Sequence, residues 1–319
     1  MTRIETALTR LLGIDLPIVQ AGMSWASSAP ELPLAVSRAG GLGVLAAGPM
    51  RPDDLRSAIR TVRAGTDRPF AVNLPLYRKG VEETLELLLA ERPPVLIASQ
   101  GGPRRYLDRF HDAGVLCLHV VAGPEHARKA AAAGVDGLVV VGAEAGGHPP
   151  PDLVSTLVLA RAVAAAVPAT PFLVSGGFAD GHGLAAALAL GAGAAQFGTR
   201  FLLSTEANVH PAYQRAVLAA SVADPQPVGR DLGVIRAIPN AFTREMHRLE
   251  ADGAALEDRR TRFSASTLKM AAFDGDVDRG KIEAGQSAGL IGEIRPAGEI
   301  VRTIATEYET ARRSLPEAR

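Results

Sequence analysis

The stretch best suited to proton transfer is residues 142–152, Gly-Ala-Glu-Ala-Gly-Gly-His-Pro-Pro-Pro-Asp, in which His148 stands between glycines and prolines. An imidazole with a pKa near ~6.5 accepts or donates a proton at neutral pH. Glycines permit a sharp backbone turn, whereas prolines fix φ and stiffen the loop. His148 is therefore a candidate acid–base residue, although a loop histidine taken alone is more often structural or solvated.

The elements that must position this loop are short apolar runs bounded by Gly or Pro, which are typical of strands buried on both faces. Segments that end at glycine or begin at proline, as helices often do, separate the runs. Eight runs over ~200 residues favour a closed (β/α)₈ TIM barrel over an open doubly wound α/β sheet. The first run also lacks the GxGxxG of a dinucleotide-binding unit. The runs begin at Pro17, Gly41, Phe70, Val95, Leu116, Gly137, Phe172 and Ala194.

The chain after the eighth run does not continue this alternation. Residues 205–290 contain charged helical patterns around an irregular stretch, 222–240. We expect this segment to be a helical insertion that covers the barrel mouth, with the last helix closing the barrel. The predicted domains are thus a barrel, 1–204 and 291–319, and an insertion or lid, 205–290.

The composition argues against several function classes. The 34 Lys and Arg balance the 34 Asp and Glu, so no net field attracts nucleic acid or an acidic membrane. The single cysteine, Cys117, can form neither an intramolecular disulfide nor a cysteine metal cluster. The N-terminus lacks the apolar core of a signal peptide, and no stretch reads as a membrane span. We expect a cytoplasmic protein without nucleic-acid or membrane partners.

The carboxyl ends of barrel strands share one face, which carries the active site. Here those ends are rich in glycine, amide and hydroxyl groups, with no carboxylate cluster for a metal. Such a surface suits a large planar ring with a phosphate tail, and the last two strand ends are where barrels commonly bind phosphate. The candidate cofactor residues are Gly22, Met23, Asn73, Gly146, Gly147, Ser175, Gly176, Gly177, Gln196, Gly198 and Thr199.

Seven motifs in register carry a family resemblance, from about Leu12 to Leu290. They are PIVQAGM, FAVNLPL, GAEAGGH, SGGFADG, QFGTRF, HPAY and AGQSAGLI. Together they resemble the FMN-dependent nitronate monooxygenases, formerly 2-nitropropane dioxygenases. They are also similar to the flavin-type enoyl-ACP reductases, which share that scaffold. The resemblance implies a TIM barrel with FMN as cofactor.

The resemblance also implies a role for each matching position. Gly22 and Met23 would lie beside the isoalloxazine ring, Asn73 at its ring or ribityl edge, and Gly146 and Gly147 near the flavin. The phosphate would be held at the ends of the last two strands, by Gly176, Gly177, Gln196, Gly198 and Thr199, with Ser175 preceding them. His148, after EAGG, would face the substrate as the catalytic acid–base residue.

The chain departs from the family pattern at two places. Val141 stands where many relatives carry a glutamine, and Pro149, Pro150 and Pro151 stand where a glycine usually follows the histidine. The first departure removes an amide that would touch the flavin. The second predicts a stiffer substrate-facing loop, so it bears on the substrate more than on the cofactor.

Two flavin-dependent functions compete. The first is oxidation of alkyl nitronates, or of nitroalkanes, with O₂. The second is reduction of an activated alkene, such as an enoyl thioester, or of a quinone by NAD(P)H, because the segment DGDVDRGKIEAGQ is of a kind also seen in enoyl reductases. A flavin-free phosphosugar isomerase would need Lys and Glu bases at the strand ends. A non-catalytic flavin-binding protein would leave His148 idle.

Overall fold

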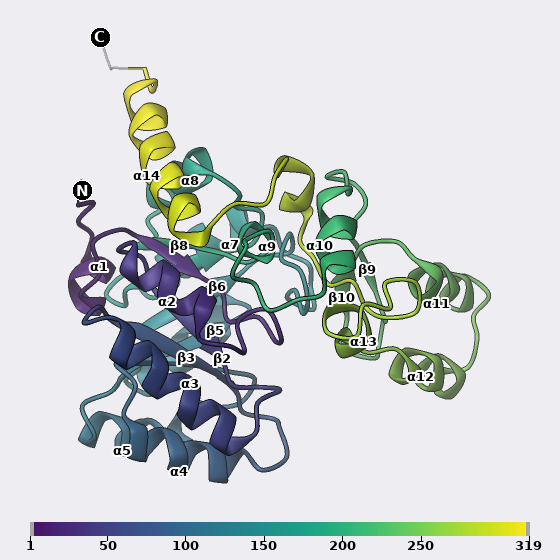
Figure 1. The fold of residues 1–319 in the computed structure, drawn as a ribbon, viewed down its shortest axis with the longest axis horizontal. Helices are drawn as coiled ribbons and strands as arrows, with labels where there is room; N and C mark the ends of the chain where they lie inside the picture. Colours follow the sequence, from purple (N-terminus) through teal and green to yellow (C-terminus); the bar gives the residue numbers. More distant parts are fainter. Residues whose placement is uncertain (1–2, 317–319) are drawn as a thin grey trace.

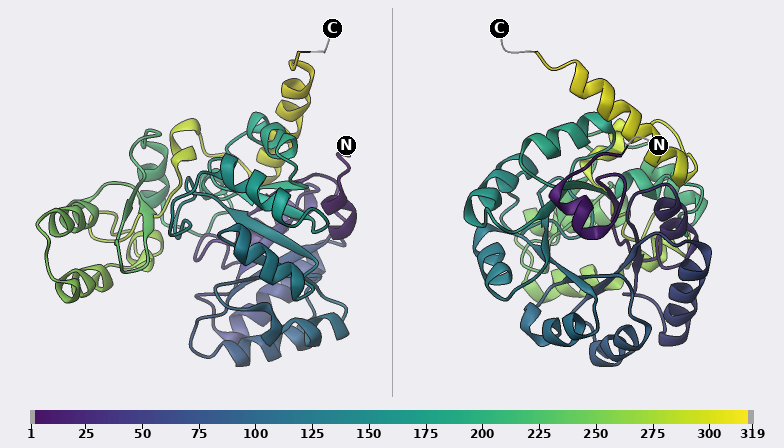
Figure 2. Two further views of the ribbon diagram at one scale, coloured as in Figure 1. Left: turned by 180° about the vertical axis from the view of Figure 1, so that it is seen from behind. Right: turned by 90° about the vertical axis from the view of Figure 1, so that its left-hand side faces the viewer.

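A computed structural model describes residues 3–316, and within them eight parallel strands curl into a barrel ringed by helices (Figure 2, right). Around the sheet the order is β1-β8-β7-β6-β5-β4-β3-β2, and a bridge between Val19 and Leu42 joins its two ends. This confirms the predicted (β/α)₈ barrel. The strands are β1 (Ile18–Gln20), β2 (Gly43–Ala46), β3 (Phe70–Pro75), β4 (Val95–Ser99), β5 (Leu116–Val121), β6 (Gly137–Val141), β7 (Phe172–Ser175) and β8 (Ala194–Phe197).

Helices alternate with these strands and cover the outside of the barrel (Figure 1). Pro52 and Pro124 occupy the first turns of two of them, where a missing N–H costs nothing. Among the described residues, no helix is long and apolar enough to cross a membrane. The helices are α2 (Glu31–Arg38), α3 (Pro52–Gly65), α4 (Val81–Glu91), η1 (Pro103–Arg105), α5 (Leu107–Asp112), α6 (Pro124–Ala132), α7 (Thr156–Ala166) and α8 (Gly181–Ala189).

An additional helix, α1 (Ala7–Leu12), plugs the end of the barrel at which the strands begin (Figure 2, right). Its Leu8 and Leu12 pack with the apolar side chains that fill the barrel. A capping box at Thr6 starts the helix, and Gly13 ends it with a left-handed φ of 69°. The sequence analysis did not predict this helix, which leaves the opposite end of the barrel for a cavity.

The short helix directly after β8 stays with the barrel, where its Phe201 is part of the core, and the chain then forms a group of elements beyond one end of the barrel (Figure 1, green). Stretch 222–240, expected to be irregular, contains an antiparallel hairpin in which Ile235 pairs with Val228. Strands this short, one with a central proline, leave no alternation to recognise. The elements are α9 (Thr199–Leu202), α10 (Pro211–Leu218), β9 (Gln226–Val228), β10 (Ile235–Ala237), α11 (Ala241–Ala251), α12 (Leu256–Ala265), α13 (Leu268–Ala272) and η2 (Gln286–Leu290).

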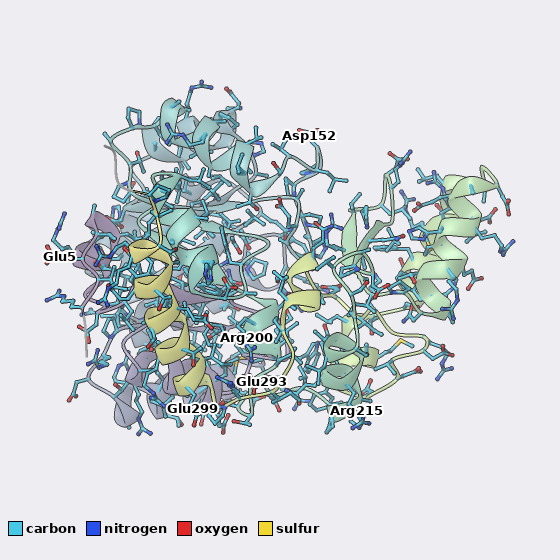
Figure 3. All side chains as sticks on the ribbon, turned by 90° about the horizontal axis from the view of Figure 1, so that it is seen from above. Glu5, Asp152, Arg200, Arg215, Glu293 and Glu299 are labelled. Atoms are coloured by element: carbon cyan, nitrogen blue, oxygen red, sulfur yellow. The ribbon has the colours of Figure 1, made fainter. Side chains whose placement is uncertain are left out.

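The last helix, α14 (Ala297–Arg313), returns to the barrel and packs against α8 and α2. Where the chain passes back, Arg200 lies beside Glu293 (Figure 3). The Arg200 guanidinium donates to the carbonyl of Glu293 at 2.9 Å and to that of Leu203 at 3.3 Å. These bonds tie the start of the segment after β8 to its return.

The contact between α8 and α14 leads to a stability prediction. A Cβ at Gly181 would collide with the backbone of Tyr308, so Gly181→Ala should lower the free energy of unfolding by about 1–3 kcal/mol. Two residues further along α8, a Cβ at Gly183 would lie 3.1 Å from the Phe178 ring and 3.5 Å from the Cα and Cβ of Phe178, with no atom of α14 nearby, so Gly183→Ala should change the free energy of unfolding much less. Denaturant unfolding of both variants measures the difference. Equal stability of the two would contradict this account of the α8–α14 contact.

Candidate active site

A cavity of about 900 Å³ opens at the carboxyl ends of the barrel strands. The loops after β1, β2, β3, β4, β6, β7 and β8 form one side of it, and the segment after β8 forms the other. TIM barrels carry their active sites on this face. All the site residues predicted from the sequence line this one cavity: Gly22, Met23, Asn73, Gly146, Gly147, His148, Ser175, Gly176, Gly177, Gln196, Gly198 and Thr199.

Close backbone approach explains the glycine after β1. A Cβ on Gly22 would lie 2.5 Å from the Cβ of Asn73, so only glycine fits. Asn73 donates its side-chain amide to the carbonyl of Ile97 at 3.0 Å, which fixes the side chain and leaves its oxygen as an acceptor. Met23 is held through its N–H, which donates to Ser27 Oγ at 3.0 Å. This wall is rigid, small and weakly polar, as a flat ring requires.

The loops after β7 and β8 bring unpaired backbone N–H groups to the cavity. Gly176 and Gly177 have φ of 117° and 82°, in the left-handed region that favours glycine. Within residues 3–316, the backbone N–H groups of Gly177, Gly198 and Thr199 donate to no acceptor. Thr199 Oγ1 accepts from the N–H of Gly285 at 2.9 Å, and its own proton remains available. Unpaired N–H groups on two adjoining loops of one cavity suit a phosphate.

Other polar side chains of the cavity are used within the protein. The Glu144 carboxylate accepts from Thr156 N at 2.9 Å and from Thr156 Oγ1 at 2.6 Å, which caps the start of α7. Gln196 donates its amide to Ser175 Oγ at 3.1 Å. The N-terminus of α7 therefore already carries a carboxylate, and an anionic ligand is expected at the β7 and β8 loops instead.

His148 is exposed, and its ring forms no hydrogen bond with any other described residue. Its loop is nevertheless fixed, because Gly147 pairs with Arg236 of β10 through N···O distances of 3.3 and 2.7 Å. The Arg236 guanidinium also donates to the carbonyl of Ala143 at 3.0 Å. On the far side Pro149 and Pro150 are buried. The prolines thus stiffen this loop, as the sequence predicted. The pairing with β10 also fixes it, and that contribution was not predicted.

Two ionisable residues of the cavity, Lys281 and Glu283, were not predicted. Lys281 Nζ lies 3.5 Å from the centroid of the Phe263 ring and 5.6 Å from that of Phe242. Burial lowers the pKa of Lys281 to about 8 and raises the pKa of Glu283. The only sequence signal for them is the polar–apolar–polar order of Lys-Ile-Glu directly before the AGQ motif.

Two further side chains shape the cavity. Val141, at the position where many relatives have glutamine, is half-buried on its wall and offers no hydrogen bond there. Trp25 lines it from the loop after β1, with a left-handed φ of 70° that is unusual for a bulky residue. Its ring lies 5.0 Å, centroid to centroid, from Phe273 of the opposite side. This aromatic contact joins the loop after β1 to the segment after β8.

Comparison with protein families gives a match over nearly the whole chain. The model of the nitronate monooxygenase family matches residues 5–85 and 76–307. Among curated proteins, a nitronate monooxygenase of Pseudomonas aeruginosa is 35% identical over 94% of this chain and 98% of its own length.

Two other relatives carry different descriptions. A Mycobacterium tuberculosis protein described as (3aS,4S,5R,7aS)-5-hydroxy-7a-methyl-1-oxo-octahydro-1H-indene-4-carboxyl-CoA dehydrogenase is 33% identical, with 97% of each chain covered. Among solved structures, FabK from Thermotoga maritima superposes with a TM-score of 0.91 and 38% identity, covering 97% of this chain and 98% of its own.

Proposed function

The chain belongs to the nitronate monooxygenase family, and we propose that it is an FMN-dependent enzyme that oxidises alkyl nitronates with O₂, with His148 as its acid–base residue. One observation carries the proposal: the residues that match the family's motifs line a single cavity in which His148 is exposed. Oxidoreductase chemistry follows from the family. The cofactor, the substrate and the residue roles are the proposal.

The residues present fit a flavin mononucleotide. The isoalloxazine ring would lie on Gly22 and Met23, with Asn73 at its edge and Gly146 and Gly147 nearby. The phosphate would accept hydrogen bonds from the unpaired N–H groups of the β7 and β8 loops and from the hydroxyl group of Thr199. The fit rests on one cavity that all these residues line and on donors that have no partner within residues 3–316.

When bound, FMN would accept the pair of electrons that the substrate gives up. The protein's own contribution is proton transfer and positioning. His148 would take the α-proton of a neutral nitroalkane, or donate a hydrogen bond to the oxygen of a preformed nitronate. The segment after β8 would limit water access to the substrate, since it forms the outer wall of the cavity and packs on the loops after β1 and β7.

A second candidate is reduction of an activated alkene by NAD(P)H in the same cavity. Specific observations favour it: the structural similarity to FabK, the similarity to a carboxyl-CoA dehydrogenase, and a cavity of about 900 Å³. Aerobic turnover of an alkyl nitronate tests the first function. Anaerobic reduction of the bound flavin by NADH or NADPH, followed by oxidation with an enoyl thioester, tests the second. If the protein is active only in the second assay, it is a reductase and the proposed nitronate oxidation is wrong.

The cofactor itself gives a separate prediction. The purified protein should carry FMN and not FAD, because the N–H groups of the β7 and β8 loops would bind a terminal phosphate. The first strand also lacks the glycine-rich turn that binds a dinucleotide. Mass spectrometry of the released cofactor measures this. FAD in the native protein would be incompatible with the phosphate assignment, and no flavin at all would exclude both candidate functions.

The compartment proposed is the cytoplasm. Cys117 is the only cysteine in the chain, and it is buried and unpaired in the structure. Burial raises the pKa of its thiol to about 12, so it is not a reactive thiolate. A chain without disulfides has no requirement for an oxidising compartment.

A further inference from the structure

Lys281 and Glu283 belong to an extended stretch that pairs with the end of β10. The N–H of Ile238 donates to the carbonyl of Ile282 at 2.9 Å, and Glu283 bridges Ala237. Successive side chains of an extended stretch point to opposite faces. Ile282 is 3% exposed in an apolar cluster, so Lys281 and Glu283 both face the other way, where they line the cavity.

The same strand fixes Glu283 relative to the histidine loop. Arg236 of β10 pairs with Gly147, and the next residue, Ala237, pairs with Glu283. The carbonyl of Glu283 also accepts from the Tyr213 hydroxyl at 2.7 Å. A Cβ placed on Gly147 would lie 3.3 Å from Glu283 Oε2. The carboxylate therefore lies against the residue that directly precedes His148.

The Glu283 carboxylate has no hydrogen-bond donor within residues 3–316, and no ion pair forms between it and Lys281 there. A half-buried carboxylate without a donor destabilises a fold, so stability does not explain it. Burial raises its pKa, while the charges of His148 and, to a smaller extent, Lys281 lower it. The ionisable groups on the elements around it are His148 and Glu144 after β6, Lys281 on its own stretch, Arg236 on β10 and Tyr213 on α10, and the Glu144 carboxylate is already bound at the start of α7.

We propose that Glu283 is the proton partner of His148, a positioning residue that accepts the proton His148 takes from the substrate. The inference rests on the proposed function. As the α-C–H bond of a nitroalkane breaks, the imidazole nitrogen binds the proton and the electron pair forms the C=N bond of the nitronate. Negative charge moves to the nitro oxygens. The exposed imidazolium then turns into contact with the Glu283 carboxylate and passes its N–H proton to it, which leaves a neutral imidazole and a neutral carboxyl group.

Removal of the carboxylate tests this role. Glu283→Gln should lower kcat for a neutral nitroalkane by roughly 10- to 100-fold with KM little changed, because a lost proton-transfer group slows chemistry and not binding. A preformed nitronate should be turned over almost normally. Glu283→Asp should restore part of the rate. Glu257→Gln, an exposed pair partner of Arg260 in the same segment, is the matched control. Wild-type kcat in Glu283→Gln, or equal loss with both substrates, would overturn the proposal.

The pH dependence of turnover distinguishes a proton-transfer role of Glu283 from a purely structural role, because only the first would change the slope of the profile. Both His148 and Glu283 must be unprotonated to accept the proton, so log kcat/KM should fall at low pH with a slope of about two, and of about one in Glu283→Gln. The Lys281 charge lowers the pKa of Glu283, so Lys281→Met should raise that pKa and move the loss of activity to higher pH. An unchanged profile in both variants would overturn the proposal.

The pairing can also be measured without any substrate. In infrared spectra, the protonated carboxyl band that is missing from Glu283→Gln should grow as the pH falls through the Glu283 pKa. His148→Ala removes a cation beside Glu283, so that midpoint should move to higher pH. A midpoint that does not move would overturn the pairing. A shifted midpoint in a protein that turns over no nitro compound would support the pairing and reject the nitronate function.

Discussion

Replacing His148 with alanine should slow turnover of a neutral nitroalkane by roughly 10²- to 10⁴-fold, the usual effect of losing an acid–base group. Bound FMN and the fold should persist. The ring is exposed and hydrogen-bonds no other described residue, while its loop is fixed by backbone pairing with β10 and by buried prolines. Preformed nitronate should be affected much less, since it has already lost its proton. Steady-state rates with both substrates, together with the flavin absorbance, measure the effect.

The pattern of loss distinguishes the roles of the ring. His182→Ala, on the exposed first turn of α8, is the matched control and should behave as wild type. Equal slowing of both substrates by His148→Ala would mean that the ring positions the anion or assists electron transfer. No slowing of either would identify His148 as a loop residue without a catalytic role. If the wild type reacts only with enoyl thioesters, His148→Ala should be tested with them. A variant whose flavin is still reduced by NAD(P)H but which no longer reduces the thioester would identify His148 as the proton donor of that reaction.

Gly177→Asp should lower flavin occupancy tenfold or more, because the new carboxylate and the phosphate would repel each other at close range. The free energy of unfolding should change little. A Cβ at Gly177 meets only Glu144 side-chain carbons at 3.4–3.5 Å, so the residue fits, and Asp is among the residues that tolerate a left-handed φ. The new carboxylate would stand where the phosphate is proposed. The flavin-to-protein absorbance ratio and the midpoint of denaturant unfolding together measure the two effects.

Gly253→Asp provides the control for backbone strain and added charge. Gly253 has a φ of 65° and open space around it, on the turn after α11. This variant should keep its full complement of FMN. Full occupancy in a folded Gly177→Asp protein would mean that the phosphate lies elsewhere, and equal losses in both variants would point to a general effect of charge.

The barrel half of the site was predictable because its information is local. Each strand is a short apolar run with a glycine, amide or hydroxyl group at its end, and eight such runs determine a closed barrel whose strand ends must meet. Asn73 and Gln196 could therefore be placed at one mouth although more than a hundred residues separate them. The plug helix α1 was missed for a different reason, because its six residues are too few for a convincing periodicity.

The outer half of the site could not be predicted, because its residues reach the cavity only through tertiary contacts. Lys281 and Glu283 lie in a stretch with no regular element of its own, and their direction depends on pairing with β10. That hairpin is itself formed from three-residue strands. No local pattern in the sequence indicates that Ala237 should lie beside Glu283, or that Arg236 should lie beside Gly147.

The two adjacent pairings of β10 have a consequence for how such enzymes could be re-engineered or diverge. The proposed cofactor contacts come from barrel loops, whereas Glu283 comes from a segment that β10 attaches to the loop of His148. A chimaera that keeps the barrel but takes this segment from a relative should retain flavin and acquire the donor's preference for substrates. It should do so only if the transplanted hairpin keeps its backbone register with Gly147. Evolution could thus change the substrate range by altering this segment while the residues proposed to bind flavin stay the same.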